Sequence, residues 1–159
     1  MATRNSPYDP DSQEATYWQA RHRLAAATRA LNEKLVSTDI GPELAATLTE
    51  KVDALTAELS QAEQVNGLVD MAKRGERGTI DNVMGELAAM AGRSHPCSPE
   101  LLWQEGPNRI TGTVTFGQAF EGPPGHVHGG WVAGVLDHLM GMTHVRTGCL
   151  LYTSDAADE

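Results

Sequence analysis

Apolar residues in the first third of the chain recur at the spacing of α-helices. The pattern predicts one helix from Thr16 to a break at Ser37–Gly41, and its apolar positions are Tyr17, Leu24, Leu31 and Leu35. Pro42 favours the first turn of a second helix, because a first-turn residue has no use for the N–H group that proline lacks. This second helix carries a continuous apolar stripe, which consists of Leu44, Leu48, Val52, Leu55, Leu59 and Ala62.

The short connection between the two helices predicts an antiparallel helical hairpin over residues 16–66. Two interpretations of its apolar positions stay open: a coiled-coil surface for a partner, or packing inside the chain. The heptad pattern lasts for only about three repeats, which favours packing inside the chain. The polar residues 1–15, with Pro7 and Pro10, are predicted to form a disordered arm.

Residues 67–92 are predicted to be a linker followed by a short helix. The stretch Gly67–Gly78 is charged and rich in glycine, which is typical of a loop. Thr79 is a suitable N-cap for the helix that follows, and Gly92 is a suitable end for it. The apolar face of that helix consists of Ile80, Val83, Met84, Leu87 and either Met90 or Ala91.

The pattern changes to strands and then to a long helix after residue 93. Residues 109–116 alternate between threonines and mainly apolar residues, which predicts the best-defined strand of the chain. The loop, short strand and turn before it are predicted at Arg93–Pro99, Leu101–Gln104 and Gly106–Asn108. The glycines and prolines of residues 122–125 mark another loop, and a helix is predicted from Gly129 to about Arg146.

The helix that begins at Gly129 has two unlike sides. A helical projection places its mainly aliphatic side at Val132, Leu136, Leu139, Met140 and Thr143. The opposite side holds Gly130, Gly134, Asp137 and Gly141. Each glycine inside a helix costs roughly 0.5–1 kcal/mol relative to alanine. We therefore expect another backbone or a ligand to pass close to this glycine-rich side.

The glycine-rich side also offers groups for acyl-transfer chemistry. Asp137 is a candidate general base or nucleophile, and the N–H groups of Gly129 and Gly130 are candidate donors to an oxyanion. Gly129 and Asp137 lie eight residues apart, which is about 12 Å along one helix, so one carbonyl group cannot touch both. We therefore expect two antiparallel copies of this helix, in a homodimer with composite sites.

The histidines allow a competing metal hypothesis. His126 and His128 would lie on one face of a strand, as two ligands of a metal site do. The carboxylate that such a site needs a few residues later is missing, so no metal and no cofactor is expected. His128 is instead expected to orient the loop and contact the acyl group, and His126 to support the loop. Cys97, close to His95, shows no sign of an activated nucleophile.

Composition narrows the classes of partner. The 159 residues contain 12 Lys+Arg and 21 Asp+Glu, a net charge of −9, which argues against nucleic acid because phosphate binding needs a basic surface. No apolar run approaches the roughly 20 residues of a membrane helix, and no signal peptide is visible. No membrane partner is therefore expected, and the expected location is cytoplasmic. The two cysteines, Cys97 and Cys149, do not indicate a disulfide framework.

The loop and helix start at residues 122–137 resemble a known family. The run GPPGHVHGG at Gly122–Gly130, followed by Val135-Leu136-Asp137, looks like the hotdog-fold acyl-CoA thioesterases of the phenylacetate-degradation type. Residues 93–148 as a whole are similar to actinobacterial members, which carry a helical extension before the hotdog domain. The resemblance implies an α+β hotdog fold, in which an antiparallel sheet wraps a long central helix, and a homodimer or homotetramer.

The resemblance further implies hydrolysis of an acyl-CoA thioester. The Gly129 amide would polarise the thioester carbonyl, Asp137 of the other subunit would act as general base or nucleophile, and His128 would help to shape the site. His138 stands where many members have glutamate, and this departure bears on local hydrogen bonding. The expected substrate contacts are Gly130, Gly134 and His126.

The last eleven residues, 149–159, match the translation of a sequencing-library adapter, so this tail is expected to be non-native. A hotdog sheet needs about four more strands after the helix. Residues 93–148 are therefore expected to be the N-terminal part of a hotdog domain, inactive as a fragment. Resequencing the source DNA beyond the Gly148 codon tests both expectations. A frame that continues into alternating strands would support them, and one that stops after Glu159 would contradict them.

Two other classes of function stay open. A hotdog relative without catalysis would only bind acyl-CoA or an acyl carrier, and Asp137→Asn would leave such a protein nearly unchanged. A helical interaction module would use residues 16–64, and those residues would self-associate without the rest of the chain.

Overall fold

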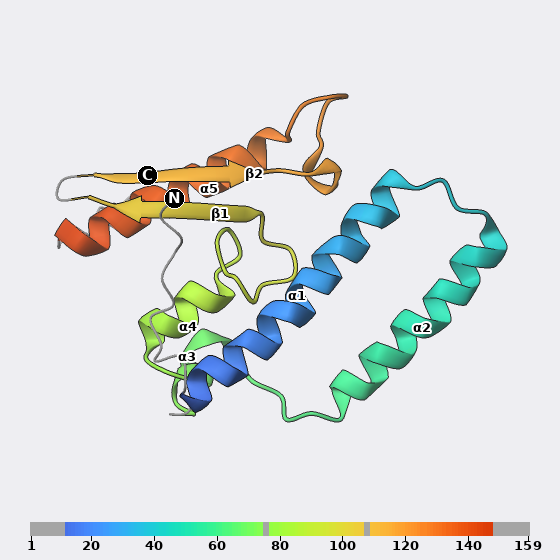
Figure 1. The fold of residues 1–159 in the computed structure, drawn as a ribbon, viewed down its shortest axis with the longest axis horizontal. Helices are drawn as coiled ribbons and strands as arrows, with labels where there is room; N and C mark the ends of the chain where they lie inside the picture. The colour runs from blue at the N-terminus through green and yellow to red at the C-terminus, as the bar shows by residue number, and fades with distance from the viewer. Residues whose placement is uncertain (1–11, 75–76, 107–108, 148–159) are drawn as a thin grey trace, which may run out of the picture.

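The structure, a computed structural model, describes residues 12–74, 77–106 and 109–147 and has an α+β architecture (Figure 1). The helices are α1 Gln13–Ser37, α2 Pro42–Ser60, α3 Gly67–Ala72, α4 Ile80–Leu87, the short 3-10 helix η1 Gln118–Phe120, and α5 Gly129–Thr147. The strands are β1 Glu100–Glu105 and β2 Ile110–Thr115. The predicted non-native tail and most of the predicted arm fall on residues 148–159 and 1–11, outside the described residues.

Helix α1 begins three residues before its predicted start. The Ser12 hydroxyl accepts a hydrogen bond from the Ala15 N–H, which caps the helix, so residues 13–15 do not belong to the predicted arm. The buried side of α1 also differs from the predicted stripe. It consists of Ala15, Trp18 and Ala25. Of the predicted stripe, Tyr17 packs beside Trp18, whereas Leu24, Leu31 and Leu35 are exposed.

Helices α1 and α2 run antiparallel, as predicted, but they lie apart (Figure 1). Helix α2 begins at Pro42, as predicted, and buries none of its residues. The interpretation that its apolar stripe packs inside the chain is therefore wrong. The physical reason lies at the far end of α2, where Val65 and Leu68 pack on the core around Trp18 and hold the connection to α3 at the base of α1.

The first core lies where α1, α3 and α4 meet, and its buried residues are Ala15, Trp18, Met71 and Val83. Helix α3 corrects the prediction of a linker at Gly67–Gly78. Met71 is buried there, and such tertiary contact stabilises a short helix that its own sequence does not favour. Helix α4 begins after the predicted cap, Thr79, but ends at Leu87 rather than near Gly92, because the backbone of Ala88 is extended.

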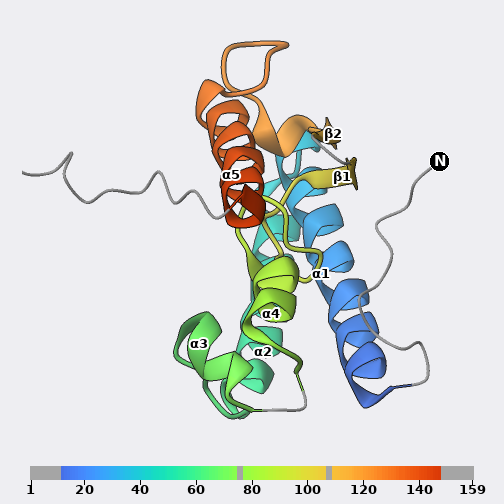
Figure 2. The same cartoon turned by 90° about the vertical axis from the view of Figure 1, so that its left-hand side faces the viewer.

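The second core lies between the β-hairpin and α5, at the opposite end of the molecule from α3 and α4 (Figure 2). β1 and β2 pair antiparallel and extend close to their predicted bounds. Val114 and Phe116 pack on this core, as the alternation of β2 predicted. The buried residues of the core are Ala91, Leu101 and Val135.

The side of α5 that packs on the hairpin matches the predicted aliphatic side only at Leu139. Val135 and Leu139 contact the second core. Val132, Leu136 and Met140 are exposed. A sheet of two strands covers only one narrow side of a helix, and that side is fixed by the contacts of Val135. Large apolar residues of α5 therefore stay open to water.

No helix within the part of the chain that the structure describes is both long enough and apolar enough to span a bilayer.

Candidate functional site at the start of helix α5

The loop between β2 and α5 folds back on itself and positions the start of α5. An isolated antiparallel bridge joins its two arms, and the Gly122 N–H donates to the His126 carbonyl oxygen at 2.9 Å. The arms come so close that a Cβ on Gly122 would lie 2.8 Å from the Cα of His128. Gly125 has φ +76°, a conformation that favours glycine. Both glycines are therefore needed for the loop to deliver His128 to α5.

His128 caps α5 and engages one of the two predicted oxyanion donors. Its Nδ1 accepts a hydrogen bond from the Gly130 N–H at 3.0 Å, and its own N–H donates to the Phe120 carbonyl oxygen at 2.9 Å. No described residue accepts a hydrogen bond from the Gly129 N–H, and a Cβ on Gly129 would meet nothing within 4 Å. Gly129 therefore presents the open amide at the start of α5, and Gly130 does not.

Asp137 lies on an exposed part of α5, just over two turns beyond Gly129. Eight residues of helix correspond to about 12 Å. The structure therefore brings His128, Gly129 and Gly130 together at the start of α5, but one chain does not bring Asp137 to them. The need for a second copy of the helix stays a prediction.

The other two predicted substrate contacts, Gly134 and His126, have neighbours from the chain itself. A Cβ on Gly134 would lie 2.8 Å from the Sδ of Met90. The space beside Gly134 is therefore occupied by a side chain from the loop after α4. The His126 Nδ1 lies 2.9 Å from the Pro124 carbonyl oxygen, so this ring braces the loop. A Cβ on Gly141 would meet nothing within 4 Å, so that end of the glycine-rich side is open.

Helix α1 holds the loop through Glu33, a residue that the sequence pattern did not single out. The Glu33 carboxylate accepts hydrogen bonds from the N–H groups of Gln118 at 2.7 Å and Ala119 at 3.1 Å. Phe120 of η1 then packs edge-on against Trp131 of α5, with ring centroids 4.9 Å apart. Helix α1 thus supports the start of α5. No local pattern could indicate this contact, because 85 residues separate Glu33 from Gln118.

Replacing Glu33 with alanine is expected to lower the free energy of unfolding by about 1 kcal/mol, the typical effect of losing a side-chain cap. Urea unfolding of the wild type and the variant measures the difference. Glu50→Ala, which removes an exposed glutamate from α2, is the matched control. Equal losses in the two variants would contradict the supporting role of Glu33.

A cavity of about 570 Å³ adjoins this contact between α1 and the loop. It is mainly apolar, and its lining includes Arg29, Leu35, Val36, Cys97, Phe120 and Trp131. Volumes of this order are typical of sites for small ligands. The cavity therefore offers space for an apolar group next to the first turn of α5.

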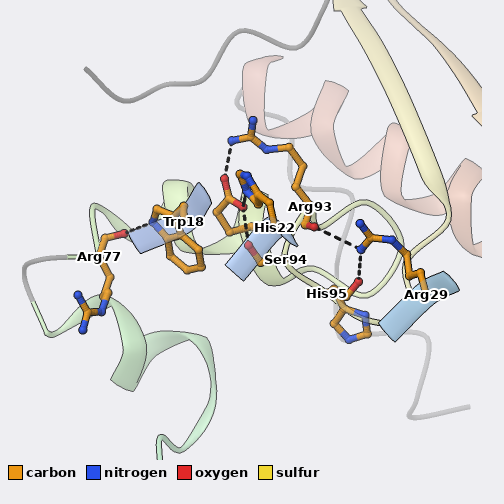
Figure 3. Close-up of polar contacts among 8 residues, drawn as sticks. Trp18, His22, Arg29, Arg77, Arg93, Ser94 and His95 are labelled. Carbon is orange, nitrogen blue, oxygen red and sulfur yellow. Dashed lines mark hydrogen bonds and ion pairs between the residues drawn. The ribbon is translucent and has the colours of Figure 1, made fainter. Parts of the chain in front are cut away.

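A buried ionic cluster joins α4 and the loop after it to α1. Glu86 is 1% exposed, and its carboxylate contacts the His22 Nε2, the Arg93 guanidinium and the Ser94 hydroxyl. Figure 3 shows His22, Arg93 and Ser94 converging. Burial raises the pKa of Glu86, but the hydrogen bond from His22 and the charge of Arg93 outweigh burial and leave the pKa below its ordinary value. The sequence indicates this cluster only through the position of Glu86, which lies three residues after Val83 on the apolar face of α4.

His95 supports its loop and is not paired with the Cys97 thiol. Its Nδ1 accepts a hydrogen bond from the backbone N–H of Cys97 at 3.2 Å. Burial, and then the positive charge of Arg29, lower the pKa of His95. Arg29 donates to the carbonyl oxygens of Arg93 and His95, which fixes the loop to α1 (Figure 3).

Within the described ranges, no group of three or more His, Cys, Asp or Glu side chains is placed to hold a metal ion. Comparison of the chain with family models, curated proteins and solved structures found no match. Function is therefore inferred from the residues and geometry of this chain, together with the resemblance at residues 122–137.

Proposed function

We propose that the protein carrying this segment hydrolyses an acyl-CoA thioester, and that residues 93–148 belong to a hotdog domain. The observation that carries the proposal is the start of α5, where the Gly129 amide is open beside the capping His128. An open amide at the positive end of a helix suits a carbonyl oxygen that gains negative charge during acyl transfer. The packing of α5 on an antiparallel hairpin supports the fold, because a hotdog sheet wraps a long helix.

In the proposed reaction a water molecule attacks the carbonyl carbon of the thioester. Asp137 accepts a proton from this water, and the Gly129 N–H donates a hydrogen bond to the oxyanion of the tetrahedral intermediate. The carbon–sulfur bond then breaks, so that the coenzyme A thiolate leaves and the acyl group keeps the new oxygen as a carboxylic acid. The proton on Asp137 passes to the thiolate, which restores the carboxylate.

This reaction needs two copies of the chain, because about 12 Å of helix separates Gly129 from Asp137. Antiparallel α5 helices related by a two-fold axis would place Gly129 of one copy near Asp137 of the other. A Cβ on Gly141 would meet nothing within 4 Å, so this end of the glycine-rich side is open to a second helix. The exposed side chains of Leu136 and Met140 lie beside Asp137 and Gly141 and would lose contact with water in such an assembly. A homodimer or homotetramer is the proposed active form.

Release of the coenzyme A thiol from a panel of acyl-CoA esters tests the proposal. The natural full-length protein is expected to release thiol over many turnovers. Asp137→Asn is expected to lower kcat/KM by about 100-fold, because a general base contributes at least that factor. Asp53→Asn, which removes an exposed aspartate from α2, is the matched control. An unchanged rate in Asp137→Asn would contradict the role assigned to Asp137.

The second candidate is a hotdog protein that binds acyl-CoA or an acyl carrier without hydrolysis. The open Gly129 amide and the cavity of about 570 Å³ suit binding as well as catalysis. One measurement separates the two candidates. If the protein only binds, labelled acyl-CoA stays intact and Asp137→Asn has the same Kd as the wild type. If the protein is an enzyme, the wild type cleaves the labelled acyl-CoA, whereas Asp137→Asn binds it without cleaving it.

A further inference from the structure

Helices α1 and α2 each expose a row of large apolar side chains. The α1 stripe consists of Leu24, Leu31 and Leu35, and the α2 stripe of Leu44, Val52, Leu55 and Leu59. Leu24 and Leu55 are 57% and 58% exposed, although each lies inside a regular helix. Soluble monomers rarely keep contiguous apolar rows of this kind open to water, so both stripes call for a partner surface.

The ends of α2 keep the two stripes apart within one chain. Residues 38–41 tie α2 to the end of α1, and at its other end Val65 and Leu68 pack on the core around Trp18. An ion pair between Glu63 and Arg74 fastens the same end. Figure 1 shows α2 attached at both ends and standing away from α1. A hairpin closed on itself would have to release these contacts.

The charges of the two helices are complementary. With histidine neutral, α1 carries four basic and two acidic residues, a net charge of +2. Helix α2 carries one lysine and four acidic residues, a net charge of −3. Arg29 is engaged with the loop before β1, but Arg23 and Lys34 are exposed on α1, so contact between α1 and α2 brings opposite charges together. Contact between two α2 helices would bring like charges together.

We propose that a second copy of this chain covers both stripes, with α1 of each copy packed against α2 of the other. A two-fold axis makes the two contacts equivalent, so four helices form one interface. The spacings of seven and four along the α1 stripe, and of three, four and eight along the α2 stripe, are those of helix–helix seams. The interface lies on α1 and α2, and it does not depend on the proposed thioesterase function.

Sedimentation velocity of the full chain tests the proposal. The wild type is expected to be at least a dimer, and Leu24→Glu and Leu55→Glu are each expected to lower its mass. Ala57→Glu adds the same charge to the opposite, exposed side of α2, and is expected to keep the wild-type mass. Circular dichroism checks that the helices persist. A monomeric wild type, or stripe variants with the wild-type mass, would overturn the proposal.

Each protein is also measured with Leu136→Glu added, so that association through α5 is separated from association through the stripes. The stripe contact is expected to survive this change, because Leu136 lies on α5. If Leu136→Glu alone abolishes all association, the stripe proposal fails. If only the stripe variants change the mass, the stripe proposal stands and assembly through α5 fails.

Mixing the two stripe variants identifies which helices pair. Leu24→Glu blocks α1 and Leu55→Glu blocks α2, so a mixed dimer keeps one contact in which both stripes are unmodified. We expect tagged Leu24→Glu protein to capture Leu55→Glu protein at a concentration where each variant alone is monomeric. Pairing of α1 with α1 and of α2 with α2 leaves no unmodified contact in the mixture, so absence of capture would overturn the assigned pairing.

Discussion

Replacing Glu86 with alanine is expected to lower the free energy of unfolding by about 3 kcal/mol. The Glu86 carboxylate is the common acceptor for His22, Arg93 and Ser94, and it is almost fully buried. Its removal leaves the Arg93 guanidinium without its anionic partner and leaves space in the contact between α1 and α4. Arg93 and His22 keep about a quarter of their side-chain exposure, so the loss falls near the lower end for a broken buried ion pair.

The same cluster makes the stability depend on pH. Because the pKa of Glu86 is lower in the folded chain than in an unfolded one, its carboxylate stabilises the fold at pH values above the ordinary glutamate pKa. This contribution is lost as the pH falls through the lowered pKa of the folded state. Glu86→Gln keeps the shape of the side chain but cannot ionise, so its stability is expected to fall less steeply in acid.

Urea unfolding at neutral and at acidic pH measures both effects. Glu58→Ala, which removes an exposed glutamate from α2, is the matched control and is expected to change the stability by less than about 0.5 kcal/mol. The lowered pKa of His95 also makes the fold less stable in acid, but this contribution is common to all the proteins compared. Parallel pH profiles for the wild type and Glu86→Gln would contradict the role of the Glu86 charge.

Helix starts could be predicted from the sequence because the signals for them act over a few residues. Pro42, Thr79 and Gly129 mark the starts of three helices correctly, and each works through backbone groups of its own first turn. Helix α3 was missed because its stability comes from the burial of Met71 against Trp18, more than fifty residues away. Local composition carries no information about such a contact.

The buried sides of the helices could not be predicted for the same reason. Counting apolar residues favoured the leucine side of α1, but the side with Trp18 and His22 is buried. Trp18 donates to the carbonyl oxygen of Arg77, and His22 bonds to Glu86, 59 and 64 residues away respectively. These polar contacts determine which side of α1 is packed, and they leave the leucine side exposed. On α5, Val135 was likewise chosen by its contact with the hairpin.

The candidate site also combines local features, which the sequence could predict, with contacts between distant segments, which it could not. The cap that His128 forms on the Gly130 N–H was not predicted, and it engages one of the two expected oxyanion donors. The start of α5 at Gly129 could be predicted, because it is a local feature of the sequence. The support that Glu33 gives to η1 could not, because it joins segments 85 residues apart. Asp137 stays a prediction, because about 12 Å of helix separates it from Gly129 within one chain.

Replacing Trp18 with alanine is expected to lower the free energy of unfolding by about 3–5 kcal/mol, at least as much as Glu86→Ala. Trp18 is 0% exposed and fills the core where α1, α3 and α4 meet. Its indole N–H also donates to the carbonyl oxygen of Arg77 at 3.1 Å (Figure 3). Chemical unfolding followed by far-ultraviolet circular dichroism measures the loss. Circular dichroism is preferred to tryptophan fluorescence, because the variant loses one of the three tryptophans that would give the fluorescence signal.

Trp18→Phe separates packing from the hydrogen bond. Phenylalanine keeps an aromatic ring in the core but cannot donate to Arg77, so we expect a loss of about 1–2 kcal/mol, much less than with alanine. Equal losses in the two variants would mean that the link to Arg77, rather than the filling of the core, holds α1 to the rest of the chain. A large difference between them means that burial of the ring anchors α1. The contact of Glu33 with η1 then depends on Trp18, because both residues lie on that one helix.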